Sequence, residues 1–133
     1  MQHPPMQHQN ITEDMQRCIV LCRECHDVCL RMVAHCLQKG GRHAEPSHIR
    51  LLLDCVQICE TSADFMVRGS DLHAATCSAC AEVCDRCAED CERLGDDEMM
   101  RYCAQLCRRC AELCHKMAGA LAETRTPVGS ATL

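Results

Sequence analysis

The sequence predicts an all-α protein, an antiparallel up-down-up-down four-helix bundle with a Cys-lined core. Three observations support this prediction. Cysteines recur at helical spacing along the 133 residues, Gly and Pro interrupt the chain at well-separated places, and no useful length of chain alternates as a strand would. The connections between the helical segments are short, and short connections place consecutive helices antiparallel to each other.

Each predicted helix has a recognisable start or end. Asn10 with Glu13 three residues later fits a capping box, and Gly40 ends the first segment. Pro46 suits the first position of the second helix, and Ser70 suits the cap of the third. Acidic residues open the fourth helix, where the helix dipole favours them. The helices are expected at about 11–39, 46–68, 70–94 and 96–123, in a bundle spanning 11–123 between a flexible tail at 1–10 and a C-terminal tail at 124–133.

The 16 cysteines dominate the composition, which includes no Trp and only one Tyr and one Phe. Steps of four, three and four residues occur between Cys18 and Cys29, between Cys80 and Cys91, and again from Cys103 on. Such steps mark the stripe of a bundle helix that faces its partners, so we expect every thiol to point toward the bundle axis. The predicted metal ligands are Cys18, Cys22, Cys25, Cys29, Cys36, Cys55, Cys59, Cys77, Cys80, Cys84, Cys87, Cys91, Cys103, Cys107, Cys110 and Cys114.

A row of inward thiols suits Cu(I). Residues four apart on a helix have Cβ atoms roughly 5–6 Å apart, so one soft ion can lie between two sulfurs. Cu(I) is selected by soft donors and accepts two or three thiolates, whereas Zn(II) requires four ligands in a tetrahedron. Two unshared thiolates per ion would give about eight Cu(I) per chain, and bridging sulfurs would give on the order of sixteen. This pattern predicts capacity rather than catalysis.

Methionine and histidine side chains gather at both ends of the predicted bundle. Thioethers and imidazoles bind Cu(I) more weakly than thiolates do, which suits loading and exchange. We therefore expect one of the two ends to be the copper entrance. The candidate ligands there are Met15, Met66, His73 and Met117 at one end and His48 and Met100 at the other.

Composition and charge exclude several classes of protein. A net charge of −5 argues against a nucleic-acid surface, and no apolar run is long enough for a membrane span. The first ten residues have neither the basic nor the apolar region of a secretory signal, which predicts a cytoplasmic protein. In a reducing cytosol, cysteines are expected to be metal ligands rather than disulfides.

Other functions remain as alternatives at this point. The sequence contains no nucleophile–base pair, phosphate loop or paired inward carboxylates, so we expect no enzyme. A Zn(II) store, an iron–sulfur or redox protein, and a purely structural helical module are the competing interpretations. Zinc is less favoured because its sites would require four cysteines to converge at once, which rows of two-ligand sites do not require.

The CxxxCxxCxxxC runs within residues 11–123 resemble those of the copper storage proteins, in particular the cytosolic branch of that family. The resemblance implies many Cu(I) ions per chain inside the bundle and assembly into a homotetramer. A copper chaperone or a low-molecular-weight thiol is the expected donor. Outward apolar residues on the first two helices are candidates for a subunit contact; they are Val20, Leu30, Leu37, Leu53 and Val67.

Overall fold

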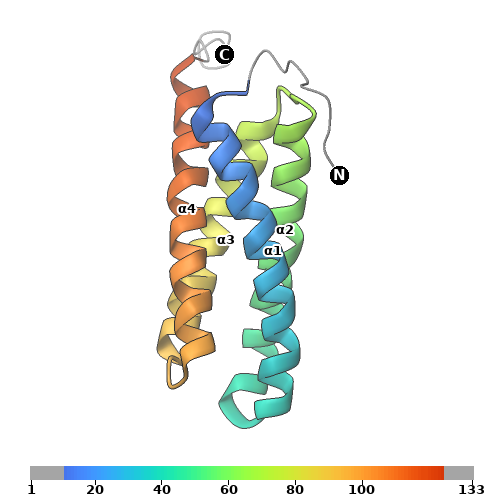
Figure 1. Ribbon diagram of the computed structural model, residues 1–133, viewed down its shortest axis with the longest axis vertical. Helices are drawn as coiled ribbons and strands as arrows, with labels where there is room; N and C mark the ends of the chain where they lie inside the picture. The colour runs from blue at the N-terminus through green and yellow to red at the C-terminus, as the bar shows by residue number, and fades with distance from the viewer. Residues whose placement is uncertain (1–10, 125–133) are drawn as a thin grey trace, which may run out of the picture.

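Four helices run up, down, up and down along one axis in the computed structural model, which describes residues 11–124 and side chains as far as Gly119 (Figure 1). No strand occurs within these residues, so the all-α four-helix prediction is confirmed. The predicted tail at 1–10 and the tail residues from 125 on lie outside the described part of the chain. The helices are α1 (Glu13–Lys39), α2 (Pro46–Val67), α3 (His73–Arg93) and α4 (Glu98–Thr124), with a 3-10 turn, η1 (Gly41–Ala44), between α1 and α2.

The start of α1 differs from the predicted capping box. Thr12 is the capping residue, and its Oγ1 accepts a hydrogen bond from the backbone N–H of Met15 at 3.1 Å. Thr12 directly precedes the helix in an extended conformation, so its hydroxyl reaches the third helical residue, as an N-cap requires. Asn10 lies outside the described residues. At the other end of α1, Gly40 adopts a φ of 74°, a value that is unfavourable for residues other than glycine.

The remaining helix starts agree with their sequence signals except at α3. Pro46 is the first residue of α2, as expected. Helix α3 begins at His73 rather than Ser70, because the Ser70 hydroxyl accepts a hydrogen bond from the backbone N–H of Leu72 at 3.0 Å and holds a turn there. Before α4, the Asp97 carboxylate accepts from the backbone N–H of Met100 at 2.7 Å. This contact satisfies one of the free donors at the helix start.

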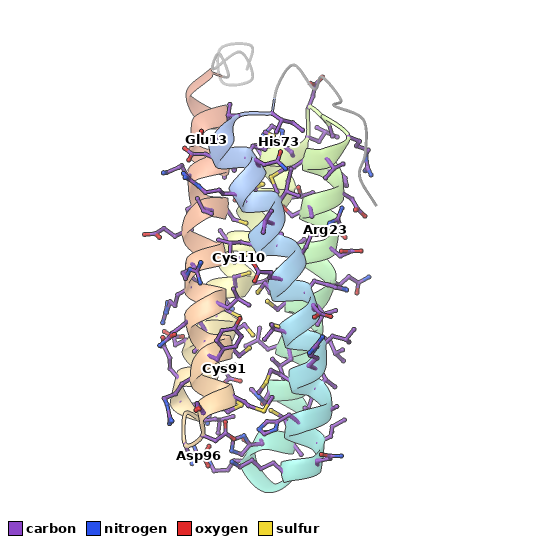
Figure 2. The ribbon with its side chains drawn as sticks, in the orientation of Figure 1. Glu13, Arg23, His73, Cys91, Asp96 and Cys110 are labelled. Atoms are coloured by element: carbon purple, nitrogen blue, oxygen red, sulfur yellow. The ribbon has the colours of Figure 1, made fainter. Side chains whose placement is uncertain are left out.

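Cysteine side chains form the core. All sixteen are buried, and none exposes more than 1% of its surface. Small residues let α3 and α4 approach closely, since Ala81 and Ala88 on α3 and Ala104 and Ala111 on α4 are also buried. No helix in residues 11–124 is long and apolar enough to cross a membrane. Because the cysteines are buried between the helices, their sulfur atoms lie along the inside of the bundle, as Figure 2 shows.

Candidate metal centre

The cysteine sulfurs form a column along the bundle axis, which we call the sulfur column. Its neighbouring sulfurs are in contact: Cys18 Sγ lies 3.6 Å from Cys114 Sγ, and Cys22 Sγ lies 3.7 Å from both Cys110 Sγ and Cys114 Sγ. All sixteen cysteines are free thiols. The sequence prediction that these side chains point to one axis is therefore confirmed, while their role as metal ligands stays a proposal.

Most of these sulfurs fall into groups whose members all lie within 4.8 Å of one another. Four groups contain four cysteines each, and we number them as tetrads from the end of the bundle near Met15; a group of three precedes them. Each tetrad shares two cysteines with the next, so the groups form one continuous chain. The triad is Cys18, Cys77 and Cys114; tetrad 1 is Cys22, Cys80, Cys110 and Cys114; tetrad 2 is Cys59, Cys80, Cys84 and Cys110; tetrad 3 is Cys25, Cys55, Cys59 and Cys84; tetrad 4 is Cys25, Cys29, Cys55 and Cys107.

The tetrads correct one step of the sequence argument. Zinc was disfavoured because rows of two-ligand sites do not require four cysteines to converge. Four cysteines do converge, repeatedly, because the bundle brings the stripes of different helices to one axis. Spacing along a single helix carries no information on this, since it does not fix which residues of other helices lie at the same height.

The thiols perturb one another's ionisation. Hydrogen bonds from neighbouring thiols, the largest from Cys107, lower the pKa of Cys103 to about 2. At the other end of the column, hydrogen bonding with Cys110 is the largest of the contacts that raise the pKa of Cys114. In a row of touching thiols, some sulfurs accept hydrogen bonds as thiolates while others stay protonated and donate. Binding of metal ions throughout the column therefore requires the release of protons.

One end of the column has mixed donors; we call it the His48 end, made of Cys36, His48, Asp90 and Met100. His48 Nε2 lies 3.3 Å from Cys36 Sγ, and Met100 Sδ lies 3.6 Å from the same sulfur. His48 Nδ1 lies 2.6 Å from a carboxylate oxygen of Asp90. Two of the predicted end ligands, His48 and Met100, are thus beside a thiol.

The His48 end can accept a proton from a thiol. Burial, followed by the nearby charges of Cys103 and Asp97, raises the pKa of Cys36 to about 11, so this thiol is protonated at neutral pH. Burial would raise the pKa of Asp90 as well, but hydrogen bonds with His48 and Arg93 outweigh it and lower that pKa. The Asp90 carboxylate can therefore stabilise a protonated His48. Sequence reasoning missed Asp90, because an acid next to the cysteine stripe looks like part of an exposed face.

The opposite end, the Met66 end, consists of Met15, Ser62, Met66, His73, Cys77 and Met117. The three methionines are buried, whereas the His73 ring is half-buried and its Nδ1 lies 2.9 Å from the Ser70 carbonyl oxygen. Ser62 occupies the stripe position after Cys59, and its Oγ lies 3.3 Å from Cys77 Sγ. Its position three residues after Cys59 fits the spacing of the cysteine stripe, but only the structure identifies its contact with Cys77.

Four other histidines contact backbone or carboxylate groups outside the sulfur column. His26 Nδ1 lies 2.8 Å from the Val56 carbonyl oxygen. The rings of His35, His43 and His115 lie beside carboxylates of Asp97, Asp96 and Asp85. These contacts hold helices and loops together outside the sulfur column.

The fold and the column together define a helical-bundle protein with a thiol core suited to soft metal ions. Residues 11–119 match the family described as copper storage protein. The chain belongs to the copper storage protein family. No protein of curated function matches it by sequence.

Three solved structures are similar to this chain, and two of them are described as copper storage proteins. The Nmul_A1745 protein from Nitrosospira multiformis is 46% identical with a TM-score of 0.76, covering 81% of this chain and 97% of that one. The Cu(I)-bound form of BsCsp3, copper storage protein 3 of Bacillus subtilis, is 30% identical with a TM-score of 0.74, covering 80% and 99%. The Streptomyces lividans copper storage protein loaded with 10 copper equivalents is 30% identical with a TM-score of 0.72, covering 87% and 92%.

Proposed function

We propose that this chain stores many Cu(I) ions per molecule as cargo, held by the thiolates of the sulfur column. The observation that carries the proposal is the sharing of cysteines between successive tetrads. A sulfur that belongs to two groups can bridge ions in both, so the number of ions is not limited to one per pair of thiols. Cu(I) suits this arrangement because it accepts two or three soft ligands.

Copper enters this column at the His48 end. Each Cu(I) that binds a thiol must displace a proton, and Cys36 is a protonated thiol in contact with a histidine that a carboxylate supports. His48 takes the proton from Cys36 as copper binds, and Met100 provides a weak third donor during transfer. Asp90 is partly exposed and also binds the more exposed Arg93, which connects this end to the surface.

The chain acts as a storage protein, without an enzymatic step, in the cytosol. A relative from Streptomyces lividans is described as a cytosolic copper storage protein. Sixteen free thiols also suit a reducing compartment. A copper chaperone or a low-molecular-weight thiol supplies the ions. Half-exposed apolar residues on α1 and α2, among them Val20, Leu30 and Leu53, provide a contact for assembly into a homotetramer.

An anaerobic Cu(I) titration of the reduced protein tests the storage function. The protein competes with a chromogenic Cu(I) chelator while copper and thiols are both quantified. We expect the protein to withhold copper from the chelator until about eight to sixteen equivalents have been added. Saturation at one or two equivalents would contradict storage and favour a transfer role.

A further inference from the structure

Tetrad 4 differs from the other groups in its regularity. Of the six distances between its four sulfurs, five lie between 3.7 and 3.9 Å, and the sixth is within 4.8 Å. In tetrad 3, four of the six distances lie between 3.6 and 3.9 Å, and in tetrad 1 the contacts from Cys22 to Cys110 and Cys114 are 3.7 Å each. Cys29 and Cys107 belong to tetrad 4 alone, so an ion in tetrad 4 can bind both of them without competing with an ion in another group.

These distances match a tetrahedral four-thiolate ion. With metal–sulfur bonds of about 2.3 Å, the sulfurs of a Zn(II) site lie about 3.8 Å apart along each edge of the tetrahedron. The sulfurs of tetrad 4 already have nearly this spacing, so an ion at their centre requires almost no movement of the helices. They come from three helices, Cys25 and Cys29 from α1, Cys55 from α2 and Cys107 from α4.

Neighbouring thiols can stabilise the charge of such a site. Zn(II) with four thiolates carries two negative charges, which are costly to bury without hydrogen-bond donors. Cys103 Sγ lies 3.8 Å from Cys29 Sγ, and Cys84 Sγ lies 3.7 Å from Cys55 Sγ. The Cys84 thiol can donate an S–H hydrogen bond to the Cys55 thiolate, as outer-shell partners do in metal sites.

We propose that tetrad 4 is a preformed binding site for one Zn(II) ion, with Cys25, Cys29, Cys55 and Cys107 as its four ligands. Binding displaces the S–H protons that these four thiols still carry, and the protons leave to the solvent. This site is the first to be filled by zinc, ahead of the less regular tetrads and ahead of the mixed donors at the His48 end. It does not depend on copper storage.

The test uses the reduced full-length chain and one equivalent of Zn(II). X-ray absorption at the zinc edge determines the ligands, and competition with a zinc chelator determines the affinity of this first ion. We expect four sulfur ligands at about 2.3 Å in the wild type. We expect Cys29→Ser to lower the affinity for the first Zn(II) ion at least about tenfold, because the next tetrads are less regular. The matched controls Cys36→Ser and His48→Ala should leave this affinity unchanged.

Two results would overturn the proposal. One is a nitrogen ligand in the first zinc site together with loss of affinity in His48→Ala, which would place the ion at the His48 end. The other is an unchanged affinity in Cys29→Ser. The Cu(I) capacity of the same variants is measured separately, so failure of the zinc site is distinguishable from failure of copper storage.

Discussion

The centre of the sulfur column and its His48 end use cysteine in different ways. In the centre, each thiol contacts other thiols, and seven cysteines belong to two groups at once, namely Cys25, Cys55, Cys59, Cys80, Cys84, Cys110 and Cys114. At the His48 end, Cys36 contacts an imidazole and a thioether instead. Shared thiolates provide capacity, whereas a thiol beside a proton acceptor provides a way to start binding.

This difference indicates that different mutations can change the number of Cu(I) ions held and the rate of copper uptake. A thiol in the centre can pass its proton only to another sulfur, so its ionisation depends on its neighbours. Cys36 can instead pass its proton to His48, which contacts the partly exposed Asp90. Variants in the centre should therefore change how much copper is held, and variants at the His48 end should change how fast it is taken up.

The largest expected effect comes from removing shared sulfurs. The double variant Cys25→Ser/Cys55→Ser removes the two cysteines common to tetrads 3 and 4. The matched control Cys36→Ser/Cys91→Ser removes two thiols outside all groups. We expect the first variant to lose about twice as many Cu(I) equivalents as the control, because each shared sulfur bridges ions on both sides. Equal losses in a chelator competition would refute the bridging role.

The next effect is on the rate of loading. We expect His48→Ala and Asp90→Asn to slow Cu(I) uptake about tenfold at neutral pH, because Cys36 then lacks its proton acceptor. Capacity should change by no more than about one ion. Stopped-flow absorption of the copper–thiolate bands measures the rate.

A triple variant at the opposite end serves as the control for loading. Met15→Leu/Met66→Leu/Met117→Leu removes the thioethers of the Met66 end while keeping buried apolar side chains. It should load at the wild-type rate. If it loads slowly while the His48 and Asp90 variants load normally, copper enters at the Met66 end.

A smaller gain in capacity is expected at Ser62. Ser62→Cys adds a thiol beside Cys77, next to the triad of Cys18, Cys77 and Cys114. A fourth sulfur would complete a tetrad at this end, so we expect the variant to hold about one more Cu(I) than the wild type. Ser62→Ala is the control and should leave the count unchanged. An unchanged count in Ser62→Cys would mean that the triad is not a binding position.

The smallest effect concerns the stability of the His48 end. Asp97 accepts a hydrogen bond from the start of α4 and binds His35 and Lys39 of α1. We expect Asp97→Ala to lower the free energy of unfolding by about 1 kcal/mol at pH 7, the usual effect of losing a helix cap. Urea denaturation of the reduced, metal-free protein measures it. Glu82→Ala, which removes only an exposed ion pair, should have little effect.

This effect should depend on pH. Burial would raise the pKa of Asp97, but its bonds with Lys39, the backbone of Met100 and His35 outweigh burial and leave the pKa well below its usual value. The ionised group therefore stabilises the fold fully above about pH 4, its unfolded pKa, and less as pH falls toward the folded pKa. The difference between wild type and Asp97→Ala should shrink below about pH 4, and a constant difference would contradict the assignment.

The sequence predicted the helices and the inward direction of the cysteines because both depend on spacing along one helix. Steps of four and three residues are enough to place Cys18, Cys22 and Cys25 on one face. The grouping of Cys25 and Cys29 with Cys55 and Cys107 was not predictable in this way, since it depends on the relative height of three helices. Asp90 was missed for the same reason: its partner His48 is 42 residues away on another helix.

The most direct test of the account is to locate the bound ions. Crystals of the fully loaded protein, measured at the copper edge, give an anomalous difference map in which copper atoms stand out. We predict copper peaks along the bundle axis, within bonding distance of the shared cysteines of all four tetrads. Peaks confined to the two ends or to surface histidines, with the tetrads empty, would contradict storage in the sulfur column.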